Sequence, residues 1–258
     1  MESKVEIDQV SATSKLLEKV KNLPPPLNNL SEFLQKYGGV LTGSFLFSCV
    51  MPTAFEANDI DVVFGKNYLE AAQAMEAVGW RCGANNRLKS RDGYCNLAHV
   101  TNEFNMIFKN KPEDVSIKCV DGEQLIQTKY SEHVKFNFIV YKECQTQSDI
   151  QKCIDEYFDL DGTTLQYDGK SWHIAADVDL DLFLHKKGMY YRESQLSARV
   201  PKPEHAPHYS TCNDLPWEIS IGRWIEERLK KYESRGFTIL NVRKVREYLY
   251  DFMTKPSL

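Results

Sequence analysis

The sequence predicts an α+β protein: a mixed β-sheet with helices on one face, followed by a mostly helical C-terminal region. Three observations predict this class. Helical and strand patterns alternate over the first part of the chain, several short β-prone segments follow, and two amphipathic helical stripes end the sequence. The 258 residues are 42% hydrophobic and 26% charged, which is ample material for a core.

The first part of the chain reads as alternating helices and strands. Residues 1–22 are predicted to be helical, and the prolines of "LPPPLNN" end that helix. A second helix over 31–37 stops at a Gly-Gly pair, and "VLTG" then forms a short strand before a helix over "SFLFSCVM". The β-branched segment "IDVVF" predicts a strand at 60–64. Apolar residues spaced by three between 69 and 78 predict the next helix.

Later segments predict further strands, and the sequence pattern changes near residue 150. The strand candidates are "NLAHV" (96–100), "FNMIF" (104–108), "VSIKCV" (115–120) and "KFNFIVY" (135–141). A short helix over "IQKCIDEYF" follows, and "DLDGTTLQYDGKSWHIA" predicts a strand, an Asp-Gly turn and a second strand. We expect residues 1–150 to form the core with its N-terminal helices, and 151–258 to form a hairpin and a helical region packed on it.

The segment "DVDLDLFLHKKG" (177–188) has two interpretations. As a strand it would align Asp177, Asp179 and Asp181 on one face, which would resemble a metal site. As a helix it has acids at its start, basic residues at its end and Gly188 beyond, which is the charge order that a helix dipole favours. Three aligned carboxylates without a cation would repel, so the helix is the favoured prediction.

The end of the chain predicts a proline-broken loop over 197–216 and two helices. The first stripe consists of Ile221, Trp224, Ile225, Leu229 and Tyr232. The second consists of Val242, Val245, Leu249 and Phe252, with Asn241 as the expected cap. From residue 216 onward nine basic residues outnumber six acidic ones, which an RNA or DNA acceptor would suit. Solvated faces of two amphipathic helices explain the excess as well, and we favour them.

Two short motifs carry the chemistry. Asp59 and Asp61 lie one residue apart in a strand and therefore share a face, where an unpaired buried carboxylate is costly. Paired carboxylates are typical holders of Mg²⁺, and two such ions can clamp a phosphoryl displacement. Gly43 and Ser44 lie where a strand passes into a helix, so backbone amides and a hydroxyl could meet a polyphosphate. Together these residues predict a site for a metal-bound nucleoside triphosphate.

This order of motifs resembles the nucleotidyltransferase superfamily, which includes DNA polymerase β and antibiotic nucleotidyltransferases. The family pattern of an apolar residue, Gly, Gly or Ser, a gap, and acid–apolar–acid–apolar stands here as Thr42-Gly43-Ser44 and Asp59-Ile60-Asp61-Val62. Thr42 departs mildly from the apolar residue, and the gap is slightly longer than usual. The resemblance implies a nucleotidyltransferase-like fold. The segments "EYFDLDGTTLQYDGKSWHIA" and "ERLKKYESRGF" further resemble nucleotidyltransferase-like proteins of large DNA viruses, phages and some fungi, a group without a settled activity.

The resemblance also implies a third carboxylate on a later strand, beside the first two. The strand candidates offer Asn105 and Asn137, which bring no charge and no general base, so Asn137 is assigned to nucleotide binding. Asp159 or Asp161 of "FDLD" could supply the missing acid. The predicted catalytic residues are therefore Asp59, Asp61 and Asp159, with Asp59 and Asp61 as metal ligands.

The expected function is Mg²⁺-dependent (Mn²⁺ is possible) transfer of a nucleoside monophosphate from a triphosphate to an acceptor hydroxyl of an RNA, a protein or a small molecule. Two alternatives stay open. One is a catalytically weakened or inactive module that binds a nucleotide or a protein. The other is a glycosyltransferase holding Mn²⁺ and a sugar nucleotide, against which the Gly-Ser segment argues. The net charge of −4 gives no global attraction for nucleic acid or an anionic membrane. Seven scattered cysteines and the lack of a signal or membrane segment favour a cytoplasmic protein (host cytoplasm if viral) with reduced thiols.

Overall fold

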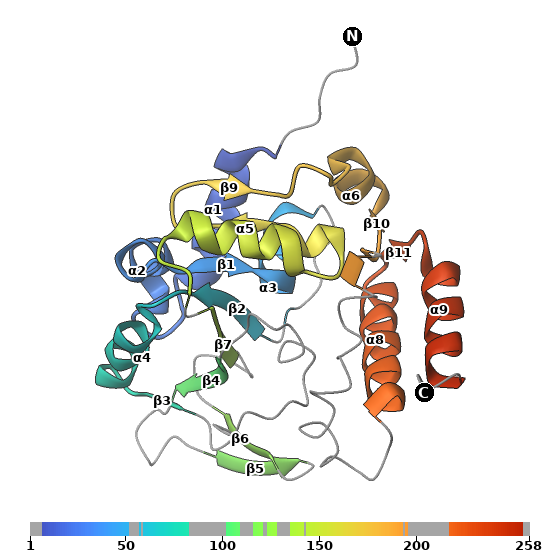
Figure 1. Cartoon of the computed structure of the whole chain (residues 1–258). Helices are drawn as coiled ribbons and strands as arrows, with labels where there is room; N and C mark the ends of the chain where they lie inside the picture. Colours follow the sequence, from blue (N-terminus) through green and yellow to red (C-terminus); the bar gives the residue numbers. More distant parts are fainter. Residues whose placement is uncertain are drawn as a thin grey trace.

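The structure is a computed structural model that describes residues 7–51, 57, 59–82, 102–108, 116–120, 123–127, 135–141, 143–192, 194–195 and 217–254. Figure 1 shows a central sheet surrounded by helices, with α8 and α9 standing beside it. No helix in the described part of the chain combines the length and the apolar character that crossing a bilayer requires.

The described residues contain a seven-stranded mixed sheet in the order β3-β4-β7-β2-β1-β8-β9. Its strands are β1 (Val40–Thr42), β2 (Asp59–Phe64), β3 (Trp80–Cys82), β4 (Asn102–Phe108), β7 (Lys135–Val140), β8 (Gln166–Tyr167) and β9 (Trp172–His173). The central strands β2 and β7 are parallel, whereas every other neighbouring pair in this sheet is antiparallel. A separate hairpin consists of β5 (Ser116–Val120) and β6 (Glu123–Gln127).

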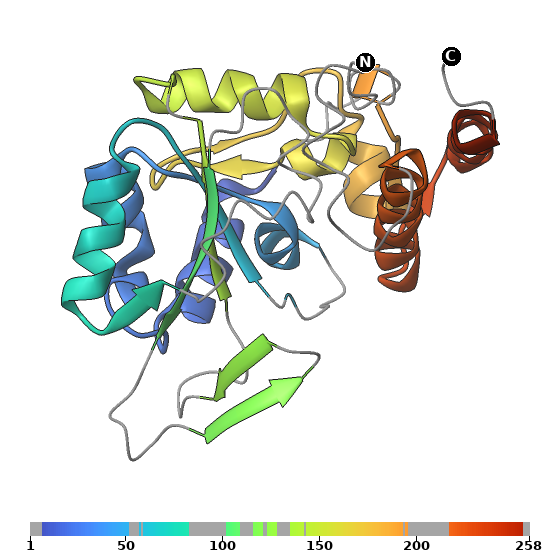
Figure 2. The same cartoon turned by 60° about the horizontal axis from the view of Figure 1, so that its bottom comes forward.

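Helices cover the two faces of the sheet unequally. On one face α1 (Gln9–Val20), α2 (Leu30–Tyr37), α3 (Gly43–Val50) and α4 (Tyr68–Ala77) share a large hydrophobic core with β2 and β7. In addition, α5 (Gln147–Tyr157) covers one end of the other face, where Ile150 and Ile154 pack on Val40, Val63 and Ile139. Figure 2 shows α5 across the sheet from α1. The other end of that face is therefore left to the polar residues described below.

Local chemistry explains where these helices begin and end. Gly38, with a φ of 67°, closes α2 in the left-handed conformation that glycine tolerates best. Thr146 and Asp149 form a capping box at the start of α5. A 3₁₀ turn, η1 (Leu27–Asn29), follows the prolines that end α1, and a second one, η4 (Asp161–Thr164), precedes β8.

The C-terminal region is mostly helical. It contains α6 (Leu180–Lys186), α8 (Trp217–Ser234) and α9 (Val242–Thr254), together with the short parallel pair β10 (Gly188–Met189) and β11 (Thr238–Ile239). α8 and α9 stand on the side of the molecule away from α2 and α4 (Figures 1 and 2). Ile225 and Leu229 of α8 and Val245 of α9 are buried in the same core as the sheet.

The predicted fold class is confirmed, because a mixed sheet with covering helices is followed by a mostly helical C-terminal region. The helical interpretation of 177–188 is also confirmed, since Asp179 caps α6 by accepting a hydrogen bond from the Leu182 amide. Its left-handed end falls on Lys187, one residue before the expected glycine. The prediction did not include β3 or β6. The strand expected at 96–100, the loop at 197–216 and residues 1–6 lie outside the described residues.

Two further expectations concern the C-terminal region. β8 and β9 form the expected hairpin around Asp168-Gly169, but they also extend the main sheet through pairing of Leu41 with Tyr167. One hydrophobic core consequently contains residues from both the part of the chain before residue 150 and the part after it. The Asn241 side chain, expected to cap α9, exchanges two hydrogen bonds with the backbone of Tyr191.

Candidate functional site

The junction between β1 and α3 brings Gly43 against the Asp-x-Asp strand. Thr42 lies opposite Asp61 in the antiparallel pairing of β1 with β2. Gly43 has a φ of 77°, and a Cβ atom there would lie 2.4 Å from Asp61 Oδ2. A side chain at this position would therefore collide with the carboxylate, and only glycine lets the two segments approach so closely.

The first turn of α3 has no side-chain cap. Thr42 occupies the cap position, but its hydroxyl lies 2.9 Å from the carbonyl oxygens of Thr163 and Leu165 and can donate to either. Ser44, which follows Gly43, is buried, and its Oγ has no hydrogen-bond partner among the described residues. The start of α3 thus has amides without a capping side chain, in addition to this unpaired hydroxyl.

Asp59, Asp61 and Asn137 form a compact polar cluster on the end of the sheet face that α5 leaves uncovered. Asn137 lies opposite Asp61 in the parallel pairing of β7 with β2. Its Nδ2 donates to Asp61 Oδ1 at 2.8 Å and to Asp59 Oδ2 at 3.3 Å. The two acids therefore lie on one face of the sheet, as the sequence predicts, and Asn137 orients both carboxylates.

Two buried oxygen atoms of this cluster have no hydrogen-bond partner among the residues that the structure describes. They are Asp59 Oδ1 and Asn137 Oδ1. Both are acceptors, and each faces a desolvation penalty unless a donor or a cation satisfies it. Carboxylate and carbonyl oxygens are the ligand types that a hard divalent cation such as Mg²⁺ prefers, so the residues present fit that ion.

The electrostatics of Asp61 reflect this surplus of acceptors. Burial, together with the neighbouring Asp59, raises the pKa of the Asp61 carboxyl to about 6. The hydrogen bond from Asn137 and the charges of Lys231 and Arg228 on α8 act in the opposite direction. The protein by itself therefore under-stabilises the ionised acid, and a bound cation would add the missing positive charge.

The basic face of α8, formed by Arg228, Lys231 and Arg235, lies within electrostatic range of the acids. These residues are spaced by three and four positions and so share one side of the helix. Asp59 and Asp61 both act to raise the pKa of Lys231, although partial loss of hydration lowers it overall even while the side chain stays exposed. From the sequence, these basic residues were interpreted as part of the solvated faces of two amphipathic helices. The segment "ERLKKYESRGF", which contains all three, was the feature that could have drawn attention to them.

Asp159 lies in a different environment from that of Asp59 and Asp61. Its Oδ2 lies 2.6 Å from Arg228 Nε, its Oδ1 accepts from the Leu160 amide, and its side chain is 1% exposed. This carboxylate is thus neutralised by Arg228 of α8. Within the described parts of the chain no group of three or more His, Cys, Asp or Glu side chains could jointly hold a metal ion.

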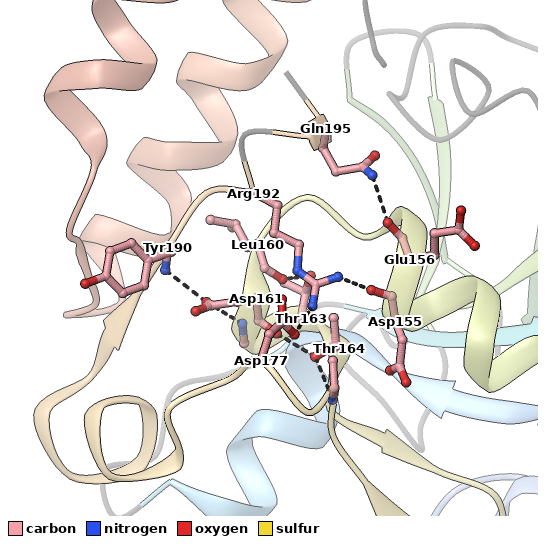
Figure 3. A network of polar contacts seen from close by, with 12 residues as sticks. Asp155, Glu156, Leu160, Asp161, Thr163, Thr164, Asp177, Tyr190, Arg192 and Gln195 are labelled. Carbon is pink, nitrogen blue, oxygen red and sulfur yellow. Dashed lines mark hydrogen bonds and ion pairs between the residues drawn. The ribbon is translucent and has the colours of Figure 1, made fainter. Parts of the chain in front are cut away.

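Asp161, the other candidate for the third acid, belongs to a polar network beside η4 (Figure 3). Its Oδ1 accepts hydrogen bonds from the amides of Gly162 at 2.6 Å and Tyr190 at 2.9 Å. Burial raises its pKa to about 6, and these two amides oppose that rise. Arg192 joins the network through the Asp155 carbonyl and Asp177. Asp161 therefore fastens the start of η4 to Tyr190, the residue that directly follows β10.

The position beside Asp61 on the neighbouring strand is occupied by asparagine. Asn137 lies opposite Asp61, and Asn105 of β4 lies opposite Asn137. Asp61, Asn137 and Asn105 therefore occupy neighbouring positions on the adjacent strands β2, β7 and β4. Of the two asparagines, Asn137 contacts the acids directly.

No family model and no curated protein matches the chain. Solved structures of CCA-adding enzymes resemble it. The apo form I enzyme has a TM-score of 0.42 and 13% identity over 95% of this chain and 54% of that chain. The complex with ATP has a TM-score of 0.41 and 15% identity over 94% and 54%, and the complex with CTP has 0.39 and 14% over 84% and 47%. The chain spans about half the length of these enzymes.

Proposed function

We propose that the protein is a metal-dependent nucleotidyltransferase that transfers a nucleoside monophosphate from a nucleoside triphosphate to an acceptor hydroxyl. One observation carries the proposal: Asp59 and Asn137, each with a buried oxygen atom that no described residue hydrogen-bonds, lie beside Asp61, whose carboxylate touches the glycine that opens α3. Acceptors without donors favour a cation, and a helix start without a cap favours an anion. A metal–polyphosphate complex satisfies both requirements.

In this proposal each residue has a defined task. Asp59 and Asp61 hold the divalent ion, with Asn137 fixing both carboxylates, and the ion would neutralise charge that develops on the phosphoryl oxygens. The Gly43 amide and the Ser44 hydroxyl donate to the β- and γ-phosphates. The acceptor oxygen forms a bond to the α-phosphorus, the bond between that phosphorus and the bridging oxygen breaks, and pyrophosphate leaves while the proton of the acceptor hydroxyl passes to solvent water.

A second candidate function is binding of a nucleotide or of a protein partner without chemistry. Asn137 is the observation that favours it, because this residue stands beside Asp61 where an active site of this class would place a third carboxylate. An amide can ligate and orient, but it cannot accept the proton of an acceptor hydroxyl. Asp159, which the sequence assigned to that role, is paired with Arg228.

Titration calorimetry with each of the four triphosphates, with and without Mg²⁺, tests binding. Release of labelled pyrophosphate, in the presence of a cell lysate as a source of acceptors, tests transfer. We expect Mg²⁺-dependent binding that Asp61→Ala abolishes. Binding without pyrophosphate release or label transfer would support the second candidate, whereas full activity in Asp61→Ala would overturn the assignment of the acids.

A further inference from the structure

The ammonium of Lys231 forms no ion pair or hydrogen bond with any residue that the structure describes. The charges of Asp59 and Asp61 nevertheless act on it. Its two neighbours on the basic face of α8 are engaged. Arg228 pairs with Asp159 at 2.6 Å and also lies over the ring of Tyr232, and Arg235 lies over the same ring from 5.8 Å. Tyr232 is buried in the main core, so this part of α8 is held in place by packing.

The charges around the candidate site are unbalanced in a way that Lys231 corrects. Asp59 and Asp61 would be matched by one divalent ion, whereas a triphosphate brings about four negative charges of its own near neutral pH. The start of α3 supplies only partial positive charge. Because Arg228 already neutralises Asp159, Lys231 is, on the described basic face of α8, the cation left to meet the remaining phosphate charge.

Resting on the proposed function, we infer that Lys231 binds the β- and γ-phosphates of the bound nucleotide and makes the site selective for a triphosphate over a monophosphate. Tyr232, the residue after Lys231, packs its ring 6.2 Å from that of Phe47, so this turn of α8 lies against α3, the helix whose first residue meets Asp61. The charges of Asp59 and Asp61 act on Lys231. A flexible ammonium with three donors suits phosphate oxygens as a point charge. Binding of a triphosphate would also join α8 to β2 and α3, closing the polyphosphate between the sheet and the C-terminal helix.

The neighbouring Lys230 provides a matched control. It lies on the same helix, one residue away, and is an exposed side chain 3.9 Å from Glu226. Lys231→Ala and Lys230→Ala remove the same charge from the same helix, but only the first removes it from the face towards the acids. Lys231→Arg keeps the charge and tests whether a cation alone is sufficient.

The experiment compares calorimetric affinities for ATP and AMP, each with Mg²⁺, in the full-length chain. We expect the wild type to bind ATP more tightly than AMP, and Lys231→Ala to weaken ATP binding about 10- to 100-fold while leaving AMP binding within twofold. Lys230→Ala should match the wild type, and Lys231→Arg should recover part of the loss. Mg²⁺ and inorganic tripolyphosphate, titrated together, should show the same dependence on Lys231.

The outcomes separate the two proposals. If the wild type binds ATP with Mg²⁺ and Lys231→Ala binds it equally well, the inference about Lys231 is wrong while the proposed site stands. If Lys231→Ala weakens ATP and AMP binding equally, Lys231 does not select the triphosphate. If the wild type fails to bind ATP with Mg²⁺ at all, both the proposed function and this inference are overturned.

Discussion

Two Asp-x-Asp segments with an apolar middle residue, Asp59–Asp61 and Asp159–Asp161, lie in different surroundings. Asp59 and Asp61 share the amide of Asn137, and Asp59 Oδ1 has no hydrogen-bond partner among the described residues. Asp159 is paired with Arg228, and Asp161 accepts from two backbone amides. Similar sequence patterns have thus produced one acid pair that the protein satisfies by itself and one that it leaves short of positive charge.

This difference shows why an Asp-x-Asp motif is insufficient evidence for a metal site. Asp61, Asp159 and Asp161 are all buried. What separates the two pairs is the supply of donors from elsewhere in the chain: an arginine from α8 reaches one pair, and a neutral amide from β7 reaches the other. Buried acids that lack donors of their own are those with something to gain from a ligand.

Removing the charge of Asp159 is expected to have the largest effect on stability. Asp159→Asn leaves the Arg228 guanidinium, whose side chain is 10% exposed, without its counter-charge. The free energy of unfolding should fall by about 3 kcal/mol, the lower end for a broken buried pair, because the amide oxygen still accepts a hydrogen bond. Urea denaturation measures this change. Mg²⁺ affinity of the folded variant should be unchanged, and loss of that affinity in a native-like variant would instead place Asp159 in the site.

The two acid pairs also differ in how far the sequence predicted them. Gly43, Ser44, Asp59 and Asp61 could be predicted together because they lie within 19 residues and a short antiparallel pairing brings them side by side. The Arg228–Asp159 pair joins residues far apart in sequence and depends on how α8 packs, which periodicity cannot give. Helix positions such as α6 followed from local charge and capping chemistry. β3 was missed because it is short and pairs with β4, far along the chain, at Trp80 and Phe108. β6 pairs with the adjacent β5, but its sequence EQLIQ contains a single β-branched residue and therefore gives a weak strand pattern.

Replacing Gly43 tests the close contact that distinguishes the first acid pair. In Gly43→Ala the new Cβ would meet Asp61 Oδ2 at 2.4 Å, in addition to a strained positive φ. Gly38→Ala is the matched control, because Gly38 has a similar φ of 67° and open space, with the nearest atom 3.9 Å away. Gly43→Ala should cost about 1–3 kcal/mol of unfolding free energy beyond the control and should weaken Mg²⁺ binding, whereas Gly38→Ala should cost about 1 kcal/mol. Equal losses and equal Mg²⁺ affinities in both variants would refute this contact.

The pH dependence of stability should expose the unmet charge of Asp61. Its pKa is about 6 in the native protein against an ordinary value of 3.8, so the native state retains a proton that the unfolded chain releases between these values. Stability therefore falls as pH rises from about 4 to 6 and then levels off. Asp61→Asn lacks the part of this loss due to Asp61, whereas Asp161, whose pKa burial also raises to about 6, contributes the same loss to both proteins. In metal-free buffer at pH 8 the variant should be more stable than the wild type by about 2 kcal/mol. Denaturation curves at pH 4 and pH 8 with a chelator provide the measurement; an Asp61→Asn variant less stable at pH 8 would contradict it.

Asn137→Asp asks whether the first acid pair is one carboxylate short, and its expected effect is the smallest. A third negative ligand beside Asp59 and Asp61 should tighten Mg²⁺ binding about tenfold, since the charge and number of oxygen ligands set the affinity of such sites. Without metal the same change should lower stability, because three buried carboxylates repel. Calorimetry with Mg²⁺ and urea denaturation with a chelator measure the two effects. Asn105→Asp is the comparison variant, because its position is one strand further from Asp61. If Asn137→Asp leaves Mg²⁺ affinity unchanged or weaker, Asn137 does not lie in the coordination sphere, and its role is to orient the two acids.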